Sequence, residues 1–181
     1  MATARQVAGE LLRLADADEE LLTQMHLHKL LYYVQGLSLG LRGIPAFQDE
    51  IQAWTHGPVV RSIRTVVGPG VPIPEGMFRD EYPSDDDRDF IRAVWNRYRT
   101  YSAWALRNMS HSERPWLEAR QGLRPDEQSD RPVSHASLTE FFALSPDSGF
   151  NAEHLLQAER DIADGRIVSH ADLKAQLLQQ Q

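Results

Sequence analysis

Cysteine is absent from the chain, and so is any long apolar run. The lack of cysteine excludes disulfides, thiolate zinc sites and cysteine nucleophiles, and it is typical of a reducing compartment. No stretch approaches the ~20 apolar residues that a membrane-spanning helix requires, and acidic residues occupy the opening segment, where a secretory signal needs an apolar run. We therefore expect a cytoplasmic protein without membrane contacts.

Positive charge is also scarce. The 181 residues include 19 Lys and Arg against 26 Asp and Glu, which gives a net charge of −7. Because phosphate neutralisation supplies most nonspecific affinity for nucleic acids, this balance disfavours DNA or RNA as a partner. The main basic cluster is the set of arginines between Arg92 and Arg107. A negative chain attracts a basic protein partner more readily, although the same charge can serve solubility alone.

Apolar residues recur at helical spacing along most of the chain, which predicts a mainly α fold. The clearest helix begins near Thr23, a good N-cap, and ends between Gly40 and Gly43. Further helices are expected near residues 7–14, after Ser84, after Ser102, at Pro115 and around residues 138–144. Residues 47–54 are too few for a full helix and too broken for a long strand, so they predict a small β-hairpin or extended element.

Glycine and proline mark the connections between these elements. The turn at residues 56–58 is predicted to lead into a helix over residues 59–67, because its proline can occupy the first helical turn. The segment 68–76, GPGVPIPEG, is predicted to be a solvated loop. We expect one compact helical domain over residues 1–143 and a helix-turn-helix-like appendage over residues 144–181.

Seven histidines raise the question of a metal or catalytic site. His26 and His28 are two positions apart in the clearest helix and point in different directions, so they cannot chelate one ion. His56 and His111 each stand near a proline and a tryptophan, which suits either an imidazole that fixes a turn or a ligand or general base. We predict no catalytic residue, no cofactor and no metal. An enzyme that uses His56 and His111 with a nearby acid is the competing hypothesis.

Other chemical motifs give little support for catalysis or for nucleic-acid binding. The chain has no GxSxG nucleophile elbow and no glycine-rich phosphate loop. Its aromatic residues fall at the spacing of a hydrophobic core and lack the interleaved lysines that would accompany base stacking. The core prediction covers Tyr32, Tyr33, Trp95, Tyr98, Tyr101 and Trp104.

Three sequence blocks carry a family resemblance. They are residues 25–36, MHLHKLLYYVQG, residues 53–60, AWTHGPVV, and residues 106–119, LRNMSHSERPWLEA. In this order they resemble the Panacea domain of SocA-like bacterial and phage proteins, over about residues 5–143. The family pattern falls on the signature residues Lys29, Tyr32, Tyr33, Gln35, Gly36, Trp54, Gly57, Pro58, Val59, His111, Pro115 and Trp116. The chain departs from the pattern at His28, where glutamine is usual, at Arg64, where tyrosine is common, and at Ser110, which replaces threonine.

The resemblance implies an antitoxin of a toxin–antitoxin system that neutralises a co-encoded toxin by direct binding. Some members of the family instead act as adaptors that deliver the toxin to a protease, which would add a protease as a second partner. We expect the signature residues to be mainly structural, with Lys29 and Gln35 tying their helix to neighbouring loops. A repressor of its own operon is a third hypothesis.

The C-terminal segment carries a second resemblance. Residues 159–177, ERDIADGRIVSHADLKAQL, are similar to the closing segments of small ribbon-helix-helix antitoxins. Two short helices with narrow apolar stripes bury little surface alone, so they dock either on the domain or on another protein. If they dock on the toxin, the expected contact residues are Leu155, Ile162, Arg166, Ile167, Leu173 and Leu177.

Overall fold

The computed structural model describes residues 2–74, 76–78 and 82–143, and the fold of this part is mainly helical, as predicted. A two-stranded antiparallel hairpin accompanies the helices. In chain order the elements are α1 Ala4–Ala17, α2 Gln24–Leu37, the π-helical turn η1 Ser38–Arg42, β1 Ile51–Trp54, β2 Gly57–Val60, α3 Arg61–Arg64, α4 Asp85–Tyr98, α5 Ala103–Ser112, α6 Arg114–Ala119 and α7 His135–Phe142. Within these ranges no helix is long and apolar enough to cross a membrane. The predicted appendage and its six contact residues lie outside the described residues.

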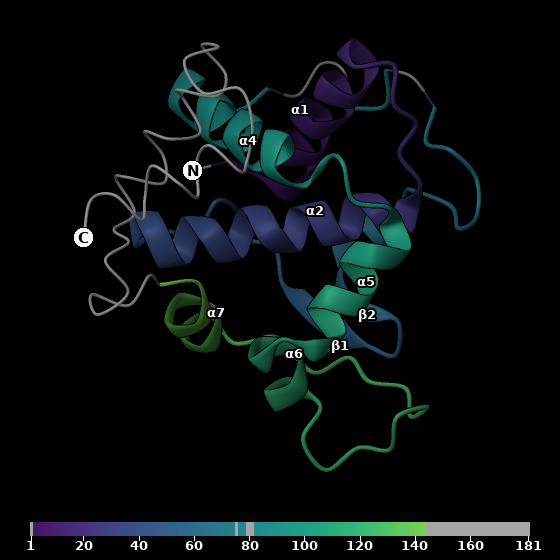
Figure 1. Ribbon diagram of the computed structural model, residues 1–181, viewed down its shortest axis with the longest axis vertical. Coiled ribbons are helices and arrows are strands. Elements are labelled where there is room, and N and C mark those ends of the chain that lie inside the picture. Colours follow the sequence, from purple (N-terminus) through teal and green to yellow (C-terminus); the bar gives the residue numbers. More distant parts are fainter. Residues whose placement is uncertain (1, 75, 79–81, 144–181) are drawn as a thin grey trace, which may run out of the picture.

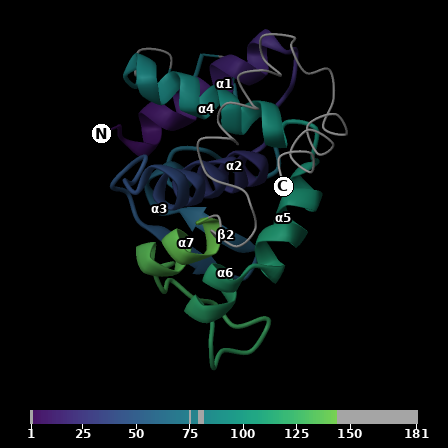
Figure 2. The ribbon, with the colours of Figure 1, turned by 60° about the vertical axis from the view of Figure 1, so that its left-hand side comes forward.

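Helix α2 is the centre of the fold. In Figure 1 it runs across the middle of the molecule, with α1 and α4 on one side and the hairpin, α5, α6 and α7 on the other. Figure 2 looks more nearly along α2 and shows the same two layers. Nearly every residue of α2 is buried, including the polar His28, Lys29 and Gln35. In a helix that is covered on all sides, these polar groups need hydrogen-bond partners on neighbouring elements. The contacts that result make up the candidate site.

Side-chain caps fix the starts of the main helices. The hydroxyl of the N-cap residue accepts a hydrogen bond from the backbone N–H three positions later in five of the described helices. These N-caps are Thr3, Thr23, Ser84, Ser102 and Ser134. The predicted starts at Thr23, Ser84 and Ser102 are therefore confirmed.

The hairpin corrects one prediction. Residues 59–67 were expected to form a helix, but Val59 and Val60 belong to β2 and pair with Gln52 and Ile51. Two adjacent β-branched residues suit a pleated, buried surface better than the first turn of a helix. The helix that follows is only α3, Arg61–Arg64. On the other edge of β1, Ala53 donates to the carbonyl of Arg131 and Val133 donates to that of Ile51, so the chain near residue 132 extends the pairing.

Helix α7 packs against the second half of α2 through Phe142. A Cβ on Gly36 would overlap the Phe142 ring, and one on Gly40 would overlap its backbone, so both positions need glycine for this close approach. The ring also meets Tyr32 edge-on, with 5.7 Å between ring centroids. The end of the described domain is thus fitted closely onto its central helix.

Residues 68–74 form a loop, as predicted, but it is not solvated throughout. Ile73 is buried, and its N–H donates to the Leu22 carbonyl at 2.8 Å. Thr23 and Pro72 form an isolated bridge beside this bond. The loop is therefore fixed to the start of α2 and forms one wall of a cavity described below.

Candidate functional site

The signature residues converge where α2 meets the hairpin and α5. Lys29 is only 1% exposed, and its Nζ donates to the Pro58 carbonyl at 2.9 Å. Burial lowers the pKa of Lys29 to about 7, and the positive charge of Arg107 contributes in the same direction. A single buried amine thereby ties α2 to the start of β2.

Gly57 makes room for this amine. Its φ of +99° is in the region that favours glycine, and a Cβ there would lie 2.6 Å from Lys29 Nζ and 3.1 Å from His111 Cδ2. The tight hairpin turn and the buried lysine therefore depend on the same residue.

His111 and Trp116 close the other side of the turn. Their rings stack with 4.1 Å between centroids, and Trp116 Nε1 donates to the Trp54 carbonyl at 3.0 Å. Burial, followed by the charge of Arg107, lowers the pKa of His111 to about 4. His111 Cδ2 would lie 3.1 Å from a Cβ on Gly57, so the ring stands beside the turn that contains His56. Across the described ranges, no cluster of three metal-ligating side chains occurs.

Gln35 holds the chain that leaves η1. Its Oε1 accepts from the N–H groups of Ala46 and Phe47 at 2.9 and 3.1 Å, and its Nε2 donates to the Phe47 carbonyl at 3.0 Å. The side chain is fully buried. One amide therefore satisfies three backbone groups of a loop that has no regular secondary structure.

The two tyrosines of the signature lie near the partly buried carboxylate of Glu113. Tyr33 donates to Glu113 Oε1 at 2.9 Å and stacks on Tyr98 with 4.2 Å between centroids. Burial, followed by the charge of Glu113, raises the pKa of both Tyr32 and Tyr33. Burial also raises the pKa of Glu113 itself, against the opposing effect of the tyrosine hydrogen bonds. This polar group joins α2, α4 and the α5–α6 junction.

Comparison with protein families agrees with this arrangement. The family model described as "Antitoxin SocA-like, Panacea domain" matches residues 27–117, about half of the chain. The chain belongs to the SocA-like Panacea family. The match runs from the first turn of α2 into α6 and is narrower than the predicted 5–143, since α1 and α7 lie outside it. No curated protein and no solved structure matches the chain.

The exposed side chains of the Panacea domain correct the aromatic prediction. Trp104 was expected in the core but is 63% exposed, and Tyr101 is also exposed. Helix α5 buries only Leu106 and Ser110, so Trp104 lies on its outer face, where Arg107 stacks over the indole at 5.6 Å. The spacing of aromatic residues alone does not reveal which face of a short helix is covered.

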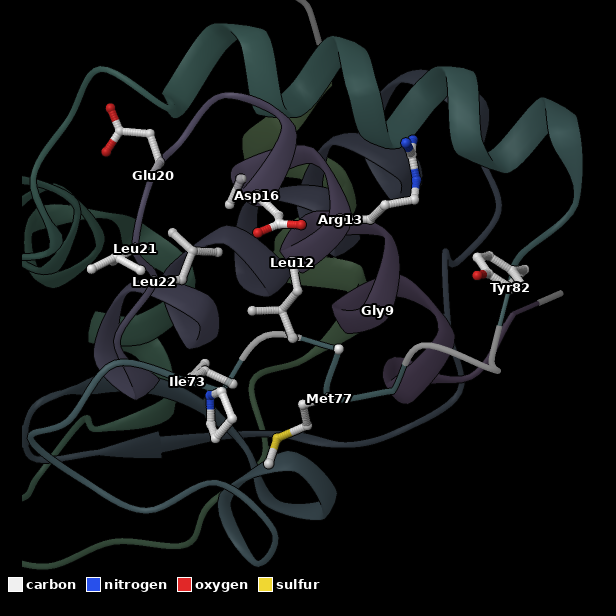
Figure 3. Close-up of a pocket in the computed structure, with 13 residues that line it drawn as sticks. Gly9, Leu12, Arg13, Asp16, Glu20, Leu21, Leu22, Ile73, Met77 and Tyr82 are labelled. Carbon is white, nitrogen blue, oxygen red and sulfur yellow. The ribbon is translucent and has the colours of Figure 1, made fainter.

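A groove lies on the α1 side of the domain. It encloses about 350 Å³ between residues of the stretch 9–22 on one side and Ile73, Pro74, Gly76, Met77 and Tyr82 on the other, and we call it the α1 groove. Leu12, Leu22, Ile73 and Met77 line the hollow, and in Figure 3 Leu12 points from α1 toward Ile73. The sequence does not predict this groove, because its two walls are about 60 positions apart and neither carries a motif.

Buried neutral histidine makes the Panacea domain sensitive to acid. His28 Nδ1 accepts from the Val60 N–H at 3.3 Å, and burial, followed by the charges of Lys29 and Arg64, lowers its pKa to about 3. Below about pH 6.5 His28 is protonated in the unfolded chain but stays neutral in the folded one. The contribution of His28 to stability is therefore complete above that pH and is lost as the pH decreases. We expect His28 alone to cost about 2 kcal/mol of unfolding free energy between pH 7.5 and 5.

His28→Gln is the matched variant for this prediction, because glutamine keeps an acceptor for Val60 and does not titrate. Urea titrations at several pH values should show that the unfolding free energy of the variant falls less steeply as the pH decreases. The difference in slope should correspond to about one bound proton. The half-buried His111 adds a smaller loss that both proteins share. Equal slopes would show that His28 is not the neutral buried group described here.

Proposed function

We propose that this Panacea protein is the antitoxin of a toxin–antitoxin system and neutralises a co-encoded toxin by direct protein–protein binding. The observation that carries the proposal is the antitoxin family match over the same residues that build the α2 and hairpin scaffold. The polar signature side chains Lys29, Gln35 and Tyr33 are engaged inside the domain, which favours a function carried out by the surface. The complex would form in the cytoplasm, without catalysis by this chain.

The C-terminal extension is the proposed contact region. We assign the domain to residues 1–143 and the extension to residues 144–181, with the contacts at the six residues named from the sequence. Residues 143–181 hold six acidic and three basic residues, so a basic toxin surface fits them. Apolar anchors would supply the affinity and charge would set the encounter rate.

Co-expression tests the function directly. The product of the neighbouring reading frame is induced in a bacterial host with and without this chain, and colony numbers and co-purification are measured. We expect arrest without the chain, growth with it, and a stable complex of the two proteins. Growth arrest in both cases, with no complex, would contradict the proposal. The same test in a protease-deficient host distinguishes direct neutralisation, which persists there, from delivery to a protease, which does not.

The extension has its own prediction. Leu173→Ala with Leu177→Ala removes two apolar side chains from one predicted helical stripe, and we expect colony recovery to fall at least about 100-fold, because each anchor is worth about 2 kcal/mol. The circular dichroism melt of the domain should not change. Leu178→Ala is the control, since it removes the same side chain next to the stripe and should leave recovery intact. Full recovery with the double variant would exclude this stripe from the interface.

A further inference from the structure

The α1 groove combines an apolar floor with an open side. Leu22 and Ile73 are buried beneath it, while Leu12 and Met77 are partly covered and Leu21 at its edge is 74% exposed. A volume of about 350 Å³ lies near the lower end of the about 300–1,000 Å³ typical of ligand sites. The groove thus has room for apolar side chains and not for a folded element.

Both walls of the groove are held in place by hydrogen bonds. Ile73 donates to the Leu22 carbonyl, as described above, and Gln6 Nε2 donates to the Tyr82 carbonyl at 2.9 Å. A preformed groove binds a partner with less loss of conformational entropy than a wall that must first be ordered. The site is therefore suited to receive a segment from outside the domain.

The charged residues on the rim of the α1 groove indicate which kind of partner segment would bind there. Asp16 and Glu20 line the groove and are exposed, and neither forms an ion pair with a basic residue in the part of the chain that the structure describes. Arg13 lines it too, but its guanidinium is held by Glu10 at 2.5 Å. In Figure 3 Arg13 points toward α4, whereas the carboxylate of Asp16 lies beside Leu12. The charge that is available to a partner next to the apolar floor is therefore negative.

We propose that the α1 groove is a second contact site for the toxin, which inserts an apolar side chain over Leu12 and Ile73 and places a neighbouring Lys or Arg against Asp16 and Glu20. This inference rests on the proposed antitoxin function. A second copy of the chain fits less well, because each copy carries a net charge of −7 and would bring like charge to an acidic rim. The α1 wall lies outside the family match at residues 27–117, so the site adds specificity to the shared Panacea scaffold.

A charge reversal with a matched control tests the groove. Asp16→Lys with Glu20→Lys is made in the full chain, and Asp126→Lys with Asp130→Lys gives the same change of net charge at exposed acids elsewhere. Binding of both to the product of the neighbouring reading frame is measured by biolayer interferometry at low and moderate salt. We expect affinity to fall about 10- to 100-fold for the groove variant and less than about 3-fold for the control.

Leu21→Ser probes the apolar part at a side chain that is too exposed to endanger folding, and it should also weaken binding at every salt concentration. Equal binding by the groove and control variants, with toxin still neutralised, would overturn the groove and leave the antitoxin function standing. Absence of binding by the wild-type chain would overturn both. A wild-type dimer in light scattering that Leu21→Ser dissociates would assign the groove to a second copy and overturn the toxin as its occupant.

Discussion

Gln35→Ala is expected to lower the unfolding free energy of the Panacea domain by about 3–5 kcal/mol, a large part of the about 5–15 kcal/mol available to a protein of this kind. The substitution removes the acceptor of the Ala46 and Phe47 N–H groups and the donor to the Phe47 carbonyl. All three backbone groups lie beside a fully buried side chain, where water cannot replace the lost bonds without opening the loop. The cavity left by the amide adds to the loss.

Thermal and urea unfolding measure this effect, and a fall in the melting temperature of roughly 10 °C is expected. Gln121→Ala is the control, because that glutamine is exposed and should change stability by less than about 0.5 kcal/mol. A loss below about 1 kcal/mol for Gln35→Ala would mean that the loop over residues 44–47 does not depend on this amide.

Gly57→Ala is expected to cost about 3–5 kcal/mol, for two separable reasons. The first is the positive φ of +99°, which disfavours any residue with a Cβ. The second is crowding, because the new methyl would lie 2.6 Å from Lys29 Nζ and 2.8 Å from Lys29 Cε. Moving the amine away from Gly57 breaks its bond to the Pro58 carbonyl and leaves a buried polar group without its acceptor.

Gly122→Ala separates the two causes. Gly122 has a φ of +81°, but a Cβ there would meet nothing within 4 Å, so this variant carries the conformational cost alone. We expect it to lose about 1–2 kcal/mol, and the difference from Gly57→Ala measures the crowding around Lys29. Equal losses in the two variants would show that Lys29 adjusts freely and that the hairpin is not tied to α2 by this amine.

Local signals in the sequence were sufficient for much of the fold. The hydroxyl N-caps and the apolar spacing of α2 and α4 depend on residues close together in the chain, and they predicted where these helices begin. The hairpin was harder, because proline at Pro58 suits a first helical turn as well as a strand edge. Only the pairing of Val59 and Val60 with β1 decides between the two, and that pairing is a tertiary property.

The candidate site, like the fold, could be predicted from the sequence only in part. The signature residues could be picked out from three sequence blocks, but their common location depends on α2 lying in the middle of the fold. Lys29 and Gln35 look like surface residues by polarity, and they are buried because neighbouring loops supply hydrogen-bond partners. Conversely, Trp104 looks like a core residue and is exposed, since nothing described covers the outer face of α5. The α1 groove could not be predicted, because its walls meet only after folding.

The seating of Phe142 against Gly36 and Gly40 has a mechanical consequence. Helix α7 is the last element of the part of the chain that the structure describes, so tension applied at residue 143 reaches the domain at Phe142. That ring abuts the helix around which every layer is built, with no methyl group between them. A motor protein that pulls from this end would have to break the packing of Phe142 against α2 at the start of unfolding. It could not first detach a loosely packed helix.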